Sequence, residues 1–204
     1  MNKAFDLLGA YAIKAVYAGK GKDEGSTEWS DTIVEFEGVK WQLLTIGGSD
    51  EFLDWIQNFI LAQIDGVKTC SYLSAHRIMT GKWGKLDCLR KLLFIKKIEP
   101  FKRLDMPLAI FCHSKSGPTG PYLKKTFCND EDYGCSFCPA PGSVKGEEVK
   151  NYKYYIDPND PVPNLGKPFF QHYDVEIEYL EDEGGIIVKD HFVEHIIAYL
   201  RQYH

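Results

Sequence analysis

The sequence predicts an α/β fold, in which a mainly parallel β-sheet has helices on both faces and an antiparallel hairpin at its edge. Segments of strand composition alternate with amphipathic helical segments along the chain, an order typical of parallel sheets covered on both sides. The 204 residues, of which 44% are hydrophobic, are enough to bury one sizeable core. Since no internal repeat, low-complexity tract or linker interrupts the chain, we expect a single domain spanning residues 1–204.

The amino-terminal elements are predicted from the spacing of their apolar residues. Residues 4–18 are expected to form a helix, because Phe5, Leu8, Ala12, Ile13 and Val16 recur at helical spacing. Two β-rich runs follow it, at 32–36 and 41–46, and a short turn at 37–39 joins them.

The middle of the chain is predicted to be largely helical. Residues 71–104 have helical character with a break at 81–84, and a helix over 88–98 is expected to lead to the next strand. This region carries the one basic cluster of the sequence, in which apolar residues are interleaved. We interpret the cluster as the solvated face of an amphipathic helix rather than as a membrane or phosphate patch. Its basic members are Arg90, Lys91, Lys96, Lys97, Lys102 and Arg103.

The remaining elements follow a strand at 107–113, where Pro107 sits at the strand edge and its missing N–H is tolerated. Short strands are expected at 135–138 and 152–156. A hairpin pairing 175–179 with 185–188, and a final amphipathic helix over 191–203, complete the predicted order.

Charge and composition exclude several classes of protein. The formal net charge of −5 argues against a nucleic-acid-binding surface, which needs an excess of Lys and Arg. No targeting signal is recognisable, and no segment approaches the length of a membrane span. We therefore expect a soluble, cytoplasmic protein without stable membrane insertion.

The cysteine count is compatible with several kinds of chemistry. Six cysteines in a chain of this length, without a signal peptide, are expected to be free thiols. Cys135 and Cys138 form a C-x-x-C pair with Cys128 upstream, a spacing found in both zinc sites and redox pairs. A structural zinc site needs four ligands, and no second pair is evident. We expect no metal.

The most informative segment is the point at which the strand ending at His113 meets Ser114. A hydrophobic strand breaks there at a serine, and a glycine-initiated helix follows. This pattern indicates a nucleophile elbow, a sharp turn that lifts a serine hydroxyl clear of the sheet and needs small residues two places to either side. Cys112 and Ser116 are small enough, but neither is the usual glycine.

An acid and a base candidate follow Ser114 in the order that α/β-hydrolases use. Asp160 follows a strand, so its carboxylate is expected at the carboxyl edge of the sheet, and His191 opens the last helix. Each residue also has an ordinary structural interpretation, such as a turn, a helix cap or a surface position. His195 lies one turn beyond His191 and is the rival base, although packing is the commoner role inside a helix.

Five segments in order resemble the class 3, fungal-type lipases, and the resemblance covers most of the chain. The family's F-R-G-T…D-W-x-x-N pattern is similar to residues 46–58, and its G-H-S-L-G-G elbow is similar to 112–117. Its T-F-G-x-P strand end resembles 136–142. Its N-x-D-x-V-P segment resembles 159–163, and its D-H resembles Asp190 and His191.

The resemblance implies an α/β-hydrolase fold and a serine esterase acting on a small-molecule or lipid ester. Ser114 would be the nucleophile, His191 the base and Asp160 the acid that orients it. The backbone N–H of Lys115 and Ser49 would form the oxyanion hole. The family chemistry implies no metal or organic cofactor.

The departures from the family pattern keep two alternatives open. Cys112 and Ser116 replace two glycines of the elbow, and Lys115 stands where the family has an apolar residue. A catalytically inactive relative that serves as an interaction or structural module would fit these changes. An acyl-transfer relative, such as a thioesterase, phospholipase or acyltransferase, would use the same site. The sequence determines neither the acyl chain length nor the oligomeric state.

Overall fold

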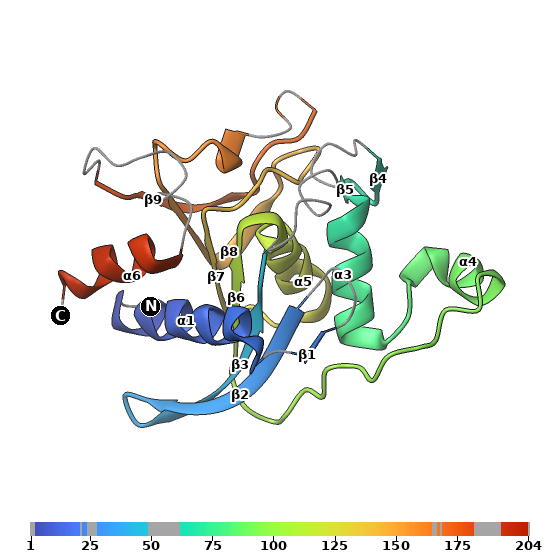
Figure 1. Ribbon diagram of the computed structural model, residues 1–204, viewed down its shortest axis with the longest axis horizontal. Coiled ribbons are helices and arrows are strands. Elements are labelled where there is room, and N and C mark those ends of the chain that lie inside the picture. The colour runs from blue at the N-terminus through green and yellow to red at the C-terminus, as the bar shows by residue number, and fades with distance from the viewer. Residues whose placement is uncertain are drawn as a thin grey trace.

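The computed structural model describes residues 3–20, 22–23, 28–48, 62–164, 167, 169–181 and 193–203, and Figure 1 shows their arrangement. The helices are α1 (Lys3–Ala15), α3 (Thr69–Thr80), α4 (Asp87–Leu92), α5 (Thr119–Phe127) and α6 (Val193–Arg201). The strands are β1 (Lys22–Asp23), β2 (Glu28–Phe36), β3 (Val39–Ile46), β4 (Gln63–Ile64), β5 (Val67–Lys68), β6 (Leu108–His113), β7 (Tyr133–Phe137), β8 (Glu148–Ile156) and β9 (Asp174–Tyr179). Short π- or 3₁₀-helical turns lie at Val16–Lys20, Gly84–Leu86, Ser114–Ser116 and Val162–Asn164.

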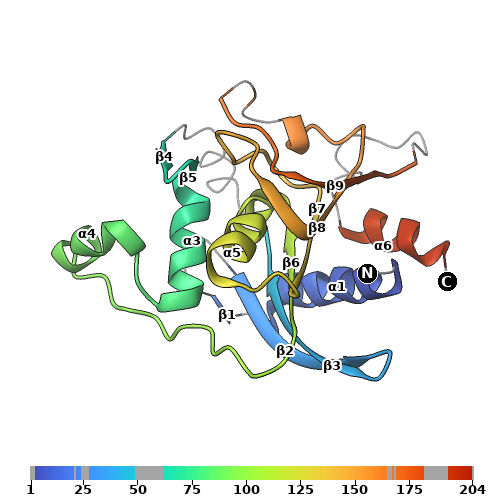
Figure 2. The same cartoon turned by 180° about the vertical axis from the view of Figure 1, so that it is seen from behind.

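The main sheet has the strand order β1-β2-β3-β6-β7-β8-β9. The pairs from β3 to β9 are all parallel, whereas β2 pairs with both β1 and β3 in antiparallel fashion. Figure 2 shows the β2–β3 hairpin from behind, at the edge of the sheet. The mainly parallel α/β fold class predicted from the sequence is therefore confirmed.

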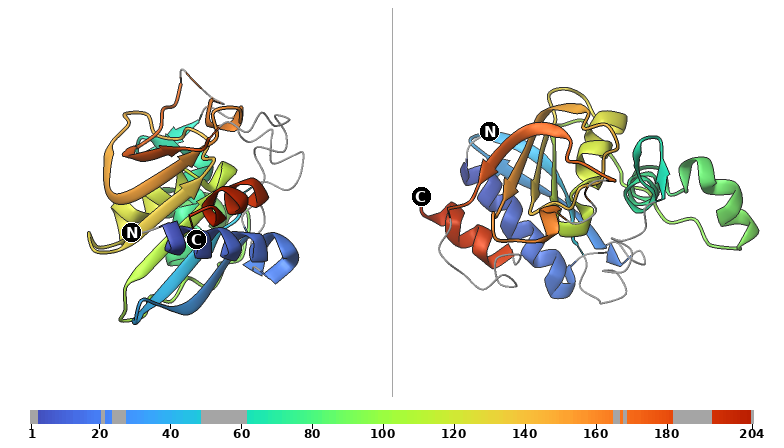
Figure 3. Two further views of the ribbon diagram at one scale, coloured as in Figure 1. Left: turned by 90° about the vertical axis from the view of Figure 1, so that its left-hand side faces the viewer. Right: turned by 90° about the horizontal axis from the view of Figure 1, so that it is seen from above.

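Both faces of the sheet are buried, and successive residues of the central strands point to opposite faces. On β6, Leu108, Ile110 and Cys112 belong to one apolar cluster, while Ala109 and Phe111 belong to the other. The first cluster includes residues of α3 and α5, and the second includes residues of α1 and α6. Figure 3 shows these two helix pairs on opposite sides of the sheet. Burial on both faces explains why the strands are continuous apolar runs rather than alternating ones.

Within the main sheet, the antiparallel pairing that the structure describes lies at the β2 edge, and β4 and β5 form a separate antiparallel pair. The predicted strands at 32–36 and 41–46 are present and pair across the predicted turn, so that Phe36 lies opposite Val39. The second predicted strand of the carboxyl-terminal hairpin, 185–188, lies outside the described residues. Its predicted partner is β9, which adds to the sheet in parallel beside β8.

The helical prediction for residues 71–104 is only partly correct. Helix α3 ends at Gly81, whose φ of 67° is left-handed, and α4 ends at Leu92, so residues 93–107 contain no helix. The interpretation of the basic cluster as one face of an amphipathic helix is therefore wrong. A short helix is stable only if it packs an apolar face, and the apolar side chains here stay exposed. Leu92 is 72% exposed and Phe94 is 92% exposed.

The six cysteines all lie in the described part of the chain, and none of them forms a disulfide. Within the described part of the chain, no helix has the length and apolar character needed to cross a membrane.

Candidate active site

Ser114 directly follows the central strand β6, at the turn into α5, and Figure 1 shows these two elements beside each other. Its φ is 58°, a left-handed conformation that non-glycine residues rarely adopt. The strained turn of a nucleophile elbow requires this conformation. Ser114 thus lies in the middle of the parallel strands, at their carboxyl edge.

Hydrogen bonds of the backbone and of the Ser116 hydroxyl stabilise the turn at Ser114. The carbonyl oxygen of Ser114 accepts hydrogen bonds from the N–H groups of Gly117 (2.9 Å) and Ala140 (3.1 Å). The hydroxyl of Ser116 accepts the N–H of His113 (3.1 Å) and lies 2.9 Å from the carbonyl oxygens of both Ile46 and His113. Ser116 therefore ties the turn at Ser114 to the end of β3.

Gly48, just beyond β3, lies directly against the elbow. A Cβ added to Gly48 would lie 2.6 Å from the Cβ of Ser114 and 2.8 Å from the carbonyl oxygen of His113. Only glycine fits at this distance. The segment that carries the predicted oxyanion donor thus reaches Ser114, although Ser49 itself lies outside the described residues.

Tyr17 connects these two segments. Its hydroxyl accepts the backbone N–H of Gly48 (2.6 Å) and forms a hydrogen bond with Nδ1 of His113 (2.6 Å), in a direction that depends on the histidine tautomer. The imidazole of His113 also accepts the backbone N–H of Ser116. One half-buried tyrosine, 96 residues away from His113 in the chain, therefore positions both the elbow and the neighbouring glycine segment.

Two buried carboxylates follow β8 at the same edge of the sheet. Asp157 and Asp160 are each 1% exposed. Oδ1 of Asp160 accepts the N–H of Val162 (2.9 Å), and Oδ1 of Asp157 accepts the N–H of Asn159 (2.9 Å). Burial, and then the nearby Asp160 carboxylate, raise the pKa of the Cys138 thiol well above its ordinary value. Asp160 thus lies beside Cys138. Cys138 is two residues before Ala140, whose N–H donates to the carbonyl oxygen of Ser114.

The structure pairs Asp157 with His195. Nδ1 of His195 lies 2.9 Å from Oδ2 of Asp157, within ion-pair distance. His195 is on α6, so this contact fastens that helix to the segment that follows β8. His191, the predicted base, lies outside the described residues, and its assignment stays a prediction.

The C-x-x-C pair consists of buried thiols. Burial raises the pKa of Cys135 well above its ordinary value, as it does for Cys138, so both are disfavoured as thiolates, the form that binds metals. Within the described ranges, no three His, Cys, Asp or Glu side chains are grouped so that they could hold a metal ion.

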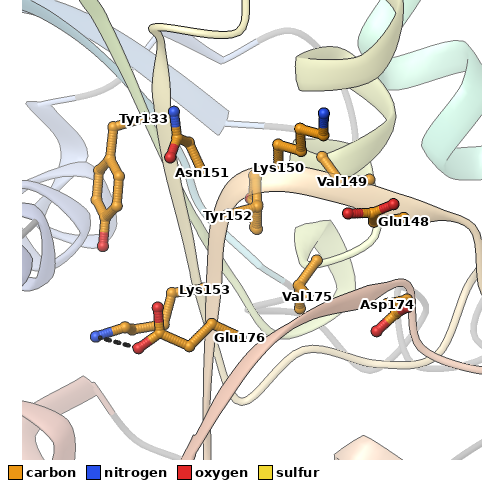
Figure 4. A pocket seen from close by; sticks show the side chains of 10 residues that line it. All are labelled: Tyr133, Glu148, Val149, Lys150, Asn151, Tyr152, Lys153, Asp174, Val175 and Glu176. Atoms are coloured by element: carbon orange, nitrogen blue, oxygen red, sulfur yellow. Dashed lines mark ion pairs between the residues drawn. The ribbon is translucent and has the colours of Figure 1, made fainter.

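A cavity of about 360 Å³ lies at the other end of the sheet, around the amino ends of β8 and β9 (Figure 4). It coincides with the register shift between Glu148 and Lys153. Nζ of Lys153 forms an ion pair with Glu176 there (3.1 Å). Since parallel strands carry Ser114 to their carboxyl edge, this cavity is separate from the candidate active site.

Comparison with known proteins supports the fold. No family model matches the sequence, and no curated protein is similar enough in sequence to show a relationship. Solved lipases match in structure. Rhizomucor miehei lipase in its propeptide complex is 11% identical over 86% of this chain and 67% of its own, with a TM-score of 0.53. A fungal lipase in complex with an inhibitor is 14% identical over 81% of this chain and 74% of its own, with a TM-score of 0.53. The Lip2 lipase of Yarrowia lipolytica is 12% identical over 89% of this chain and 80% of its own, with a TM-score of 0.50.

The chain has a lipase-like α/β-hydrolase fold. Identities this low establish a shared fold and leave the activity to be argued from the residues.

Sequence reasoning placed Ser114 and Asp160 at one edge of the sheet, and the structure brings their segments together there. It missed Tyr17, for which no local signal exists, because a tyrosine near the end of a helix is unremarkable. It also gave His195 a packing role, whereas the structure shows it against a buried carboxylate.

Proposed function

We propose that the chain is a serine carboxylic-ester hydrolase of the lipase or esterase type. The observation that carries this proposal is the left-handed φ of 58° at Ser114. A fold tolerates such strain in a non-glycine residue only where the surrounding contacts enforce it, and strained residues of this kind cluster at functional sites.

In this mechanism, the Oγ atom of Ser114 attacks the ester carbonyl carbon while His191 takes its proton. The negative charge that develops on the carbonyl oxygen is stabilised by the backbone N–H of Lys115 and by Ser49. His191 then donates the proton to the leaving alcohol, and Asp160 holds the imidazole in the required tautomer. Water hydrolyses the acyl-enzyme in the second half of the reaction, with His191 again acting as base.

His195 is the alternative base, because it lies 2.9 Å from the buried Asp157. We favour the pair of Asp160 and His191 because His191 occupies the position of the family's D-H segment, and we give the contact between Asp157 and His195 the role of docking α6. Replacing each histidine by alanine separates the two. The His191→Ala variant should lose roughly 10⁴-fold or more in kcat, and a larger loss in His195→Ala would reverse the assignment.

A serine-directed fluorophosphonate tests the nucleophile directly. The probe should modify the folded protein at Ser114, which peptide mass spectrometry locates. The Ser114→Ala variant should lose both labelling and turnover of short p-nitrophenyl esters, by roughly 10⁴ to 10⁶-fold. Ser30→Ala, a serine replacement on β2, is the matched control and should keep both.

Two outcomes would change the proposal. Folded protein that the probe leaves unmodified and that turns over no ester would favour an inactive, lipase-like interaction protein. Products in which an added alcohol carries the acyl group, in preference to free acid, would favour an acyltransferase that uses the same residues.

A further inference from the structure

Residues 82–97, here called the arm, project from the body of the protein beyond α3. The arm contains α4, and Figures 1 and 3 show it on the side of α3 that faces away from the sheet. The apolar side chains near its tip are exposed. Leu92 is 72% exposed, Leu93 is 54% exposed and Phe94 is 92% exposed.

The apolar tip of the arm is built and held in place. The buried guanidinium of Arg90 donates to Oδ1 of Asp87 (2.6 Å) and to the carbonyl oxygen of Ile95 (2.6 Å). The N–H of Ile95 in turn donates to the carbonyl oxygen of Arg90 (3.0 Å). These contacts close the turn that presents Phe94, whose φ is 54°. When a helix ends with a residue in this conformation, that residue is usually glycine. A phenylalanine here strains the backbone, so it lowers the stability of the fold.

The base of the arm is also fixed. The N–H of Lys85 donates to the hydroxyl of Tyr72 on α3 (2.7 Å), and a Cβ at Gly84 would lie 2.3 Å from that same oxygen. The arm is therefore joined to the body through α3, and its tip is presented in a set direction.

The arm is strongly basic in an acidic protein. Its charged residues are six basic side chains and one acidic side chain, Asp87, which leaves a formal charge of +5, whereas the whole chain carries −5. Lys82, Lys96 and Lys97 are exposed and stand on either side of the apolar tip in the sequence. Positive charge is thus concentrated around the most exposed apolar residues.

We propose that the arm docks the protein on an anionic lipid surface. Exposed Leu and Phe side chains insert at the boundary between headgroups and acyl chains, while flanking lysines contact anionic headgroups and bury their aliphatic stems. A bilayer needs no complementary groove, which suits a projecting tip with one fully exposed ring. This binding is peripheral and does not depend on the proposed esterase chemistry.

A second copy of this chain is the competing occupant, since the rest of the molecule is acidic. A protein partner has to supply a pocket for a tip as prominent as Phe94. The described cavities near the amino end of β8 are lined mostly by charged and polar side chains, such as Glu148, Lys150 and Lys153, with a few apolar and aromatic ones between them, which is a poor match for a phenyl ring. The lipid surface therefore fits both the shape and the charge of the arm.

Vesicle sedimentation with the full chain tests the proposal. The protein should bind vesicles of phosphatidylcholine mixed with phosphatidylserine, bind phosphatidylcholine alone much more weakly, and be released by added salt. Phe94→Asn removes the ring and keeps a residue that tolerates the left-handed conformation, so this variant should fold normally. It should bind the mixed vesicles roughly tenfold more weakly. Phe169→Asn, at another exposed phenylalanine, is the matched control and should bind like the wild type.

Charge reversal tests the electrostatic part. The double variant Lys96→Glu, Lys97→Glu should lose binding by at least about tenfold. The double variant Lys40→Glu, Lys145→Glu changes the net charge equally at exposed positions outside the arm, and it should keep most of the binding.

Four results would overturn the proposal: no binding to mixed vesicles, equal binding to neutral vesicles, equal losses in the arm and control variants, or a concentration-dependent dimer that Phe94→Asn abolishes. Vesicle binding is measured without an ester substrate, so the binding result does not depend on whether Ser114 is catalytic. The two proposals therefore succeed or fail separately.

Discussion

Replacing Gly48 by alanine should damage catalysis more than stability. The new Cβ would lie 2.6 Å from the Cβ of Ser114, 2.7 Å from the hydroxyl of Tyr17 and 2.8 Å from the carbonyl oxygen of His113. Ordinary van der Waals contact begins at 3.4 Å. The segment that carries Gly48 must therefore retreat from Ser114 by about 0.8 Å, close to the 1 Å displacement that costs roughly 10²-fold in rate.

The stability cost should be that of an overpacked site, about 1–3 kcal/mol. Thermal denaturation measures this cost, and turnover of p-nitrophenyl esters per folded molecule measures the catalytic effect. Gly9→Ala is the matched control, because its Cβ would meet the ring of Phe111 at 2.1 Å in the core. It should lose comparable stability and keep its turnover.

The reasoning would be refuted by a Gly48→Ala enzyme that keeps wild-type kcat. That result would mean that the close approach of Gly48 to Ser114 has no role in positioning the oxyanion hole. Equal losses of turnover in Gly9→Ala would attribute the effect to general loosening of the fold.

Three further predictions concern the hydrogen-bonded side chains of Tyr17, Asp132 and Asp6. Tyr17→Phe leaves the N–H of Gly48 without its acceptor, so it should cost about 1–3 kcal/mol and reduce kcat more than KM changes; unchanged kinetics would limit Tyr17 to packing. Burial raises the pKa of Asp132, but hydrogen bonds from Arg103 and from two backbone N–H groups outweigh it and hold that pKa below its ordinary 3.8. The stabilisation relative to Asp132→Asn, about 2–3 kcal/mol, should therefore be present above that value and be lost as the pH falls through the lowered pKa; urea denaturation at several pH values would show this, and a pH-independent difference would contradict it. Burial raises the pKa of Asp6 above 3.8 despite hydrogen bonds from two tyrosines. The stability of the wild type relative to Asp6→Asn should therefore depend on pH in the opposite direction and decline as the pH rises through the raised pKa; a difference that grows with pH would contradict this.

The sequence by itself determined the strands, their burial and the place of the elbow. The apolar run at 108–112 predicts a strand covered on both faces, because both sets of alternating side chains are hydrophobic. A serine between that strand and a glycine-initiated helix predicts the turn at Ser114. Ser114, Asp160 and His191 each follow a predicted strand. Since parallel strands end at the same edge of the sheet, the sequence predicts that these three residues lie along that edge.

Only the tertiary structure decided which distant groups meet and which apolar residues stay exposed. The contact between Asp157 and His195 depends on how α6 packs against the sheet, and that between Tyr17 and His113 depends on where α1 ends over β6. Phe94 is an apolar residue of a type that is usually buried, yet it is 92% exposed. Local patterns fix the conformation of a segment, whereas burial depends on which layers pack together, and packing is a property of the whole chain.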